Sequence, residues 1–316
     1  GFRSVMPDGL RLLSGPGCPV CVTANQDVDH AIALARVPGA IIATFGDMMR
    51  VPGSTSSLAA EKAAGRDVRM VYSPLDALSL AHDNPGSEVI FMGVGFETTT
   101  PTIAAAILEA QAQNLRNFSV FCAHKTTPPA LRAIAGDPHT HIDGFILPGH
   151  VSTITGIEPY RFLVDEFHIP GVITGFEPID VLEGIAMLVN MVEKDEPAIQ
   201  NAYRRGVDTK GNAVARALVN QVFEPCDAIW RGLGPIPQSG LRIRDDFAAF
   251  DATRRFEVEV EQTVEPQGCR CGDVLRGRIA PTQCPLFGRK CTPEDPIGPC
   301  MVSSEGSCAA YYRYRA

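Results

Sequence analysis

Cysteines gather near the end of this 316-residue chain. Six of its ten cysteines lie within residues 269–308, namely Cys269, Cys271, Cys284, Cys291, Cys300 and Cys308. Such crowding commonly has one of three causes: a disulfide framework, a zinc site or an iron–sulfur cluster. Disulfide frameworks are typical of small secreted domains that cannot form a core, whereas this chain is long and 45% hydrophobic.

The spacing of these cysteines favours a [4Fe–4S] cluster over zinc. Zinc ligands usually come in pairs about two to four residues apart. Here twelve, six and sixteen residues separate the four spaced cysteines, Cys271, Cys284, Cys291 and Cys308. A cubane accepts such spacing, because each iron takes one thiolate from a separate point on a wrapping loop. Zinc is the alternative, and Cys269, which is left over together with Cys300, could replace Cys271 as the first ligand.

A separate pair, Cys18 and Cys21, has the Cys-x-x-Cys spacing of redox dithiols. The pair follows a turn rich in glycine and proline at the end of a predicted strand over 10–13. Two cysteines at this spacing can close a disulfide, and a helix that begins at the first cysteine lowers its thiol pKa. Half of a zinc site and two ordinary buried cysteines are the alternatives. Because no second Cys-x-x-Cys completes a zinc site, we interpret the pair as a redox dithiol.

Polar side chains also follow three predicted strands. The residues are Asp47, Glu97 and His150, after strands over 41–45, 88–93 and 144–148. Open α/β sheets bind ligands at the carboxyl ends of their strands, and a histidine there can bind metal, shuttle protons or cap a helix. The alternatives are a solvated turn at Asp47, a capped helix start after Glu97 and a helix cap at His150.

The elements that must position these residues alternate between strand and helix from residue 10 to 193. This alternation is typical of parallel sheets and predicts the α/β class. We predict two parallel-sheet α/β units, over 1–84 and 85–199. The pattern changes after about residue 200, which predicts a smaller C-terminal iron–sulfur domain over 200–316.

The amino-acid composition indicates which binding partners and which cellular compartment to expect. The chain has 28 basic and 36 acidic side chains, which argues against nucleic acid and anionic membranes as partners. No apolar run approaches the ~18 residues of a membrane-spanning helix, and the first residues lack the pattern of a signal peptide. Ten cysteines without a secretion signal indicate a reducing cytoplasm. The chain does not begin with methionine, so we expect its natural start to lie upstream.

Short motifs run through nearly the whole chain. They are GPGCPVC at 15–21, TFGDMMRVPG at 44–53, VYSP at 71–74, GFETT at 95–99, PGHVS at 148–152, GFEP at 175–178, CPLFG at 284–288 and MVSSEGSCAA at 301–310. In their order and spacing the chain closely resembles the HypD family of hydrogenase maturation factors. One departure is the absence of the family's upstream cysteine motif, EVCGGHTH.

This resemblance implies a role in assembling the Fe(CN)₂CO unit of [NiFe]-hydrogenase. It implies that a small partner, HypC, forms the scaffold for the iron together with this chain, and that HypE delivers cyanide. The cysteine of the missing motif is the one expected to hold the transient iron with HypC. The resemblance also implies a [4Fe–4S] cluster on the four spaced cysteines that passes electrons to Cys18 and Cys21.

Four further residues, Asp47, Glu97, His150 and Glu305, are our candidates for polar groups of the reaction pocket. We expect an assembly scaffold with redox activity rather than a conventional turnover enzyme. The alternative is a stand-alone iron–sulfur disulfide oxidoreductase that takes electrons from a ferredoxin. Both interpretations use the same cysteines, whereas a structural zinc protein would use them only to hold its fold.

Overall fold

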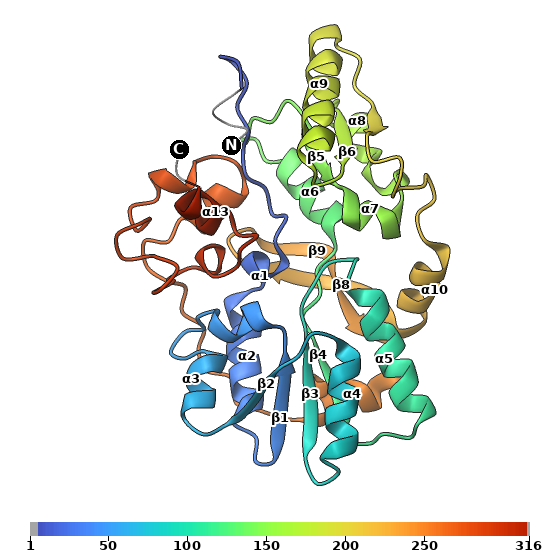
Figure 1. The fold of residues 1–316 in the computed structure, drawn as a ribbon, viewed down its shortest axis with the longest axis vertical. Helices are drawn as coiled ribbons and strands as arrows, with labels where there is room; N and C mark the ends of the chain where they lie inside the picture. Colours follow the sequence, from blue (N-terminus) through green and yellow to red (C-terminus); the bar gives the residue numbers. More distant parts are fainter. Residues whose placement is uncertain (1–5, 315–316) are drawn as a thin grey trace.

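Four parallel strands form the first sheet of the computed structural model, which describes residues 6–314 (Figure 1). In sheet order they are β2 (Asp67–Met70), β1 (Ala40–Thr44), β3 (Glu88–Gly93) and β4 (Phe118–Cys122). The inner strands β1 and β3 are buried almost throughout, which explains why they are continuous apolar runs. The boundary predicted at residue 84 falls between β2 and β3, so this sheet unites residues from both sides of it.

Helices cover both faces of this sheet because its strands alternate their side chains. Ile41 and Phe91 pack toward one face, whereas Ile42 and Ile90 pack toward the other. The helices of the first face are α4 (Pro74–Asp83) and α5 (Thr100–Ala112), and those of the second are α2 (Asn25–Ala35) and α3 (Leu58–Ala63). Ser73 caps α4 and Pro74 opens it, and both residue types are favoured at these positions of a helix start.

A second parallel sheet forms the other lobe. Its strands in order are β5 (Phe145–Pro148), β6 (Gly171–Thr174) and β7 (Ile199–Asn201). The helices of this lobe are α6 (Thr127–Ala135), α7 (Gly149–Thr155), α8 (Phe162–Asp165) and α9 (Pro178–Lys194). Leu147, Tyr160 and Ile173 lie in its core. The predicted α/β class, with parallel sheets, is confirmed.

After β7 the chain returns to the first lobe. α10 (Ala213–Val222) packs on α5, and β8 (Phe223–Trp230) and β9 (Gly234–Ile243) form an antiparallel hairpin between the lobes (Figure 1). η4 (Asp245–Phe250) and α11 (Ala252–Arg255) then pack against β4. Phe223 and Ile243 belong to the core of the first sheet. Residues 213–255 therefore join the first lobe instead of forming one unit with the cysteines that follow.

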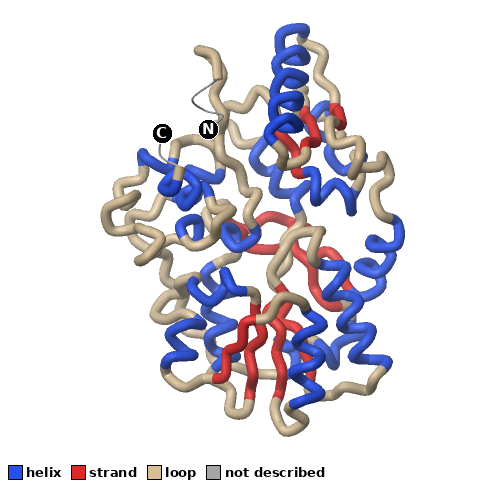
Figure 2. Tube along the Cα trace, in the orientation of Figure 1, coloured by secondary structure: helices blue, strands red, loops and turns tan. Residues whose placement is uncertain are grey.

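The cysteines lie in a final stretch of short helices and loops, residues 269–313, which we call the cysteine segment. Its elements are α12 (Cys271–Leu275), η5 (Pro281–Gln283), η6 (Pro299–Met301) and α13 (Ser307–Arg313). Figure 2 shows how much of this region is loop. The preceding linker is tied to the first lobe, because Ser54 Oγ accepts the backbone N–H of Val264 at 2.8 Å.

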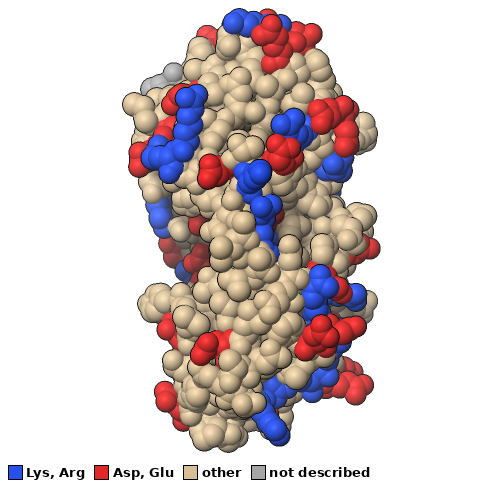
Figure 3. Space-filling view, turned by 90° about the vertical axis from the view of Figure 1, so that its right-hand side faces the viewer, with Lys and Arg blue, Asp and Glu red and all other residues tan. Residues whose placement is uncertain are grey.

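On the face shown in Figure 3, acidic and basic side chains lie in mixed groups rather than in one field of a single sign. An ion pair of the buried Lys125 with the half-buried Asp27, with an N–O distance of 3.1 Å, links the chain near α6 to α2. Within residues 6–314, no helix is both long enough and apolar enough to span a membrane.

Candidate functional site

The six cysteines of the cysteine segment line a single cavity. They are Cys269, Cys271, Cys284, Cys291, Cys300 and Cys308. Apolar side chains, among them Val274, Leu286 and Met301, complete the wall. The cavity is small, with a volume of about 20 Å³, and it is partly open to solvent. Thiols that are up to 39 positions apart in the sequence thus face one volume.

Each thiol is brought to the cavity by a different local structure. Cys271 begins α12, Cys284 ends η5, Cys300 lies in η6 and Cys308 in the first turn of α13. Cys291 closes a turn in which its N–H donates to the Leu286 carbonyl at 3.0 Å. α13 can pack on η6 only because Gly306 has no side chain, since a Cβ there would lie 2.2 Å from the Cys300 carbonyl oxygen.

Two pairs of thiols in the cavity share hydrogen bonds. The bond with Cys271, followed by burial, raises the pKa of Cys269, and the same bond lowers the pKa of Cys271. A hydrogen bond with Cys308, followed by burial, raises the pKa of Cys300. The two cysteines that the spacing left over, Cys269 and Cys300, are therefore partners of predicted ligands. Which member of each pair binds metal stays a prediction.

The donor set of this cavity fits an iron–sulfur cluster. A [4Fe–4S] cluster takes four thiolates from separate points, and here six thiols surround a largely apolar space. Within residues 6–314, no three cysteine, histidine or acidic side chains converge closely enough to hold a single metal ion. The thiols thus line a volume rather than meet at one point.

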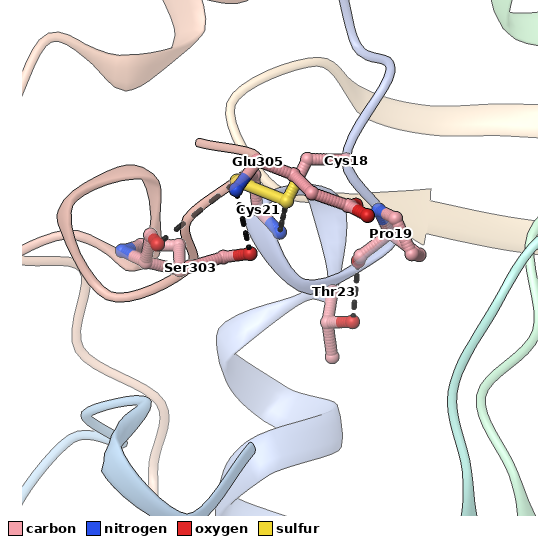
Figure 4. Close-up of a disulfide and its surroundings, with 7 residues drawn as sticks. Cys18, Pro19, Cys21, Thr23, Ser303 and Glu305 are labelled. Atoms are coloured by element: carbon pink, nitrogen blue, oxygen red, sulfur yellow. Dashed lines mark hydrogen bonds between the residues drawn. A yellow bond between two sulfur atoms is a disulfide. The ribbon is translucent and has the colours of Figure 1, made fainter. Parts of the chain in front are cut away.

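Cys18 and Cys21 form a disulfide at the start of the short helix α1 (Pro19–Val22) (Figure 4). Their Cα atoms are 5.3 Å apart, and the Cys21 N–H donates to Cys18 Sγ at 3.2 Å. Both residues are buried, at 4% and 1% exposure. Cys18 is the helix N-cap, so the pair lies at a helix start.

The disulfide lies directly against the cysteine segment. Cys21 Sγ is 3.9 Å from the carbonyl oxygen of Pro299, the residue before Cys300. Cys18, Cys21 and Cys300 belong to one buried cluster, on which Cys271 and Cys308 also pack. Figure 4 shows Ser303 and Glu305 of the same segment beside the disulfide. The two groups of cysteines, far apart in the sequence, are thus neighbours in the fold.

Glu97 follows β3 and is buried, with 9% exposure. Its Oε1 accepts the backbone N–H of Thr127 at 2.7 Å and the Thr127 hydroxyl at 3.2 Å, at the start of α6. In the described part of the chain its Oε2 has no hydrogen-bond partner. Burial raises the pKa of Glu97 to about 7, so this carboxyl can hold or release a proton near neutral pH.

The other predicted polar groups are exposed. His150 lies in the first turn of α7 with its ring 4.6 Å from that of Phe176. Asp47 lies in η2 (Gly46–Arg50), and Glu305 lies in a turn before α13. The residues next to Glu97 and His150, Phe96 and Val151, pack in the cluster that holds the disulfide. Glu305 thus lies beside the disulfide, and the chain next to Glu97 and His150 reaches the same cluster, whereas Asp47 follows β1 in the first lobe.

Sequence reasoning missed Arg231, which directly follows β8. Its side chain is 1% exposed, and its charge acts on Cys271 and lowers the pKa of that thiol, after the hydrogen bond with Cys269. Its position between a buried tryptophan and a glycine turn gives no signal that a sequence pattern could identify. Only the packing of the β8–β9 turn on α12 brings it next to the helix that begins at Cys271.

Comparison with known proteins shows to which family the chain belongs. A family model named HypD, described as "Hydrogenase formation hypA family", matches residues 1–315. The chain belongs to the HypD family. This membership indicates a role in hydrogenase maturation.

Individual HypD proteins match over almost the whole chain. The hydrogenase maturation factor HypD of Rhodobacter capsulatus is 50% identical over 99% of this chain and 85% of its own length. The protein of the same name from Azotobacter vinelandii is 48% identical, with the same shares covered. The HypD protein of Escherichia coli K12 is 45% identical over 100% of this chain and 85% of its own length. The resemblance stated from the motifs is therefore confirmed.

Proposed function

We propose that this chain acts in assembling the Fe(CN)₂CO unit of [NiFe]-hydrogenase, with HypC as the second half of the scaffold and HypE as the cyanide donor. The iron is the cargo of this reaction. Membership of the HypD family supports the proposal. The observation that carries its redox part is the contact between the Cys18–Cys21 disulfide and the cysteine-lined cavity.

We propose that the cavity holds a resident [4Fe–4S] cluster. The predicted ligands Cys271, Cys284, Cys291 and Cys308 all line it, as do Cys269 and Cys300. When bound, such a cluster supplies electrons one at a time, at a potential set by charge, hydrogen bonds and exposure. The protein's own part is to hold thiolates in an apolar wall and to keep them beside the disulfide.

Reduction of the Cys18–Cys21 disulfide consumes two electrons and two protons and yields two thiols. A one-electron donor of the ferredoxin class would supply the electrons in two steps. After reduction, the Cys21 thiol can donate its proton to the Pro299 carbonyl, which already lies 3.9 Å away. This acceptor stabilises the reduced pair in a buried site. A dithiol kept there can support reductive chemistry on the iron without releasing it to solvent.

The stand-alone disulfide oxidoreductase is the weaker alternative. A soluble disulfide substrate must reach the attacking sulfur, and Cys18 and Cys21 are 4% and 1% exposed. An assembly scaffold needs no such access, since electrons pass between buried neighbours. We further propose a cytoplasmic location, because the free thiols of the cysteine segment require a reducing compartment.

The substitution Cys18→Ser tests the redox part of the proposal. Serine keeps an N-cap for α1 but cannot form the disulfide. We expect loss of hydrogenase maturation in a complementation assay, with the iron and sulfide content of the purified protein unchanged. The matched control is Cys226→Ser, a half-buried cysteine of β8 outside the cavity, which should mature hydrogenase normally. Full maturation by Cys18→Ser would refute a redox role for this pair.

A further inference from the structure

Arg231 is a buried cation without hydrogen-bond acceptors for its side chain. The side chain is 1% exposed. Among the residues that the structure describes, none accepts a hydrogen bond from its Nε, Nη1 or Nη2. A guanidinium carries five N–H donors and stays charged, so leaving it buried without partners is costly. A group of opposite charge at this place would offset that cost.

The nearest carboxylate is a poor counter-charge. Glu265 Oε2 lies 3.8 Å from Arg231 Nε, which is beyond hydrogen-bonding distance, and the Glu265 side chain is 61% exposed. Water screens such an exposed partner, so the pair contributes little. The charge of Arg231 is therefore left mostly uncompensated by acidic side chains.

The thiols of the cavity wall are the other groups within electrostatic reach. A Cβ on Gly232, the residue after Arg231, would lie 3.5 Å from the backbone carbonyl carbon of Cys271. The next residue, Gly232, touches α12, because a Cβ on Gly272 would lie 2.4 Å from the Gly232 carbonyl oxygen. The end of β8 and the start of the helix that carries Cys271 are thus in direct backbone contact.

The same arginine is also anchored to the disulfide side. Its backbone N–H donates to the Val22 carbonyl at 2.9 Å, one residue after Cys21. The preceding Trp230 is fixed by a hydrogen bond from its Nε1 to Ser239 Oγ at 2.8 Å. The backbone of Arg231 is therefore held at the junction between α1 and the turn that packs on α12.

We propose that Arg231 is a positioning residue whose guanidinium is the fixed counter-charge of the thiolate set in the cavity, and that it raises the reduction potential of the cluster held there. This inference rests on the proposed [4Fe–4S] site. One electron enters on reduction and no covalent bond changes, so the site gains one negative charge. A buried cation stabilises the more negative state more strongly, because screening is weak there.

The test is an EPR-monitored redox titration of the full chain, purified anaerobically. Arg231→Met removes the charge at similar length, Arg231→Lys keeps a positive charge, and Arg69→Met removes an exposed arginine of β2 as the matched control. We expect the midpoint potential to fall in the Met variant, by about 59 mV for each tenfold loss in the ratio of reduced to oxidised cluster. The Lys variant should lie nearer to wild type, and the Arg69 variant should coincide with it.

Two outcomes would overturn the role of Arg231. One is an unchanged midpoint potential in an Arg231→Met protein that retains its iron and sulfide. The second outcome concerns iron content. If Arg231→Met and Arg231→Lys both lose their iron, the site needs the shape of the guanidinium and not its charge. Iron retained by Lys alone supports the proposal. If the wild-type protein itself contains no iron and sulfide, the proposed cluster is refuted. That result differs from one in which only the role proposed for Arg231 is wrong.

Discussion

The α/β lobes and the cysteine segment are stabilised in different ways. In the first lobe, helices on both faces of a sheet bury side chains such as Phe91 and Ile90 completely. The cysteine segment has a far smaller core of its own, built on Cys291, Met301 and Ala309. Burial stabilises roughly in proportion to apolar area, so the lobes can fold by packing alone.

The cysteine segment must therefore gain stability from elsewhere. Its loops contact both lobes, through the disulfide region and through an ion pair of Arg278 Nη2 with Asp137 Oδ2 at 2.6 Å. A cluster that joins four of its thiols would add the rest, since metal binding contributes directly to folding. Under this proposal, one chain combines lobes that fold by packing alone with a segment whose fold depends on its metal.

Removing a predicted cluster ligand should have the largest effect on structure. That effect should be confined to the cysteine segment. We expect Cys284→Ala to abolish the cluster and to leave the segment open to proteolysis, because its small core cannot hold these loops. The parallel sheets should keep their protection in hydrogen exchange. Iron content equal to wild type would remove Cys284 from the ligand set. Unfolding of the whole chain would contradict the independence of the lobes.

Truncating a core side chain of the first lobe should destabilise that lobe strongly. Phe91→Ala leaves a cavity between the first sheet and its helices, where Phe91 is 0% exposed. We expect a loss of about 3–5 kcal/mol in the free energy of unfolding, measured by denaturant titration. Leu286→Ala, in the cavity wall of the cysteine segment, should cost much less. Equal losses at the two sites would contradict the difference that we describe.

Glu97 gives the lobes a pH dependence of their own. Burial raises its pKa from 4.5 to about 7 in the folded chain, so the folded state binds more protons than the unfolded state in that range. Stability should fall as pH rises from about 4.5 to 7 and then level off, by at most about 3 kcal/mol. Glu97→Gln should abolish this slope in thermal melts at a series of pH values. A slope that persists in the Gln variant would mean that other groups cause it.

Disturbing the contact between the cysteine segment and the β8–β9 turn should have a smaller effect. A Cβ on Gly272 would lie 2.4 Å from the Gly232 carbonyl oxygen, at the contact between α12 and the β8–β9 turn. We expect Gly272→Ala to cost about 1–3 kcal/mol and to lower cluster occupancy in iron analysis. Gly86→Ala is the control, because a Cβ there meets nothing within 4 Å. If both variants keep wild-type occupancy, the close contact is not needed for the cysteine site.

Much of the fold could be predicted from residue patterns, because those patterns reflect local physics. The apolar runs at β1 and β3 predicted strands of a parallel sheet, and the structure buries both strands. The domain limits were harder, since strands on either side of residue 84 have the same pattern. The return of residues 213–255 to the first lobe is a long-range pairing, as in the isolated bridge between Val120 and Asp251, and no local pattern encodes it.

The candidate site was predictable in its residue types but not in its assembly. Spacing pointed to thiol chemistry at Cys18 and Cys21 and in the C-terminal region. It could not show that Pro299 lies 3.9 Å from Cys21 Sγ, a contact between residues 278 positions apart. Nor could it identify Arg231, because a buried arginine differs from an exposed one only through the packing around it.

The most direct test of the proposed cluster is the metal content of the anaerobically purified chain, with EPR spectra before and after reduction by dithionite. We predict about four irons and four sulfides per chain, no zinc, and a signal that appears on reduction. One zinc and no sulfide would contradict this prediction. In that case the cysteine segment would be a structural zinc unit, and the disulfide beside it would have no resident source of electrons.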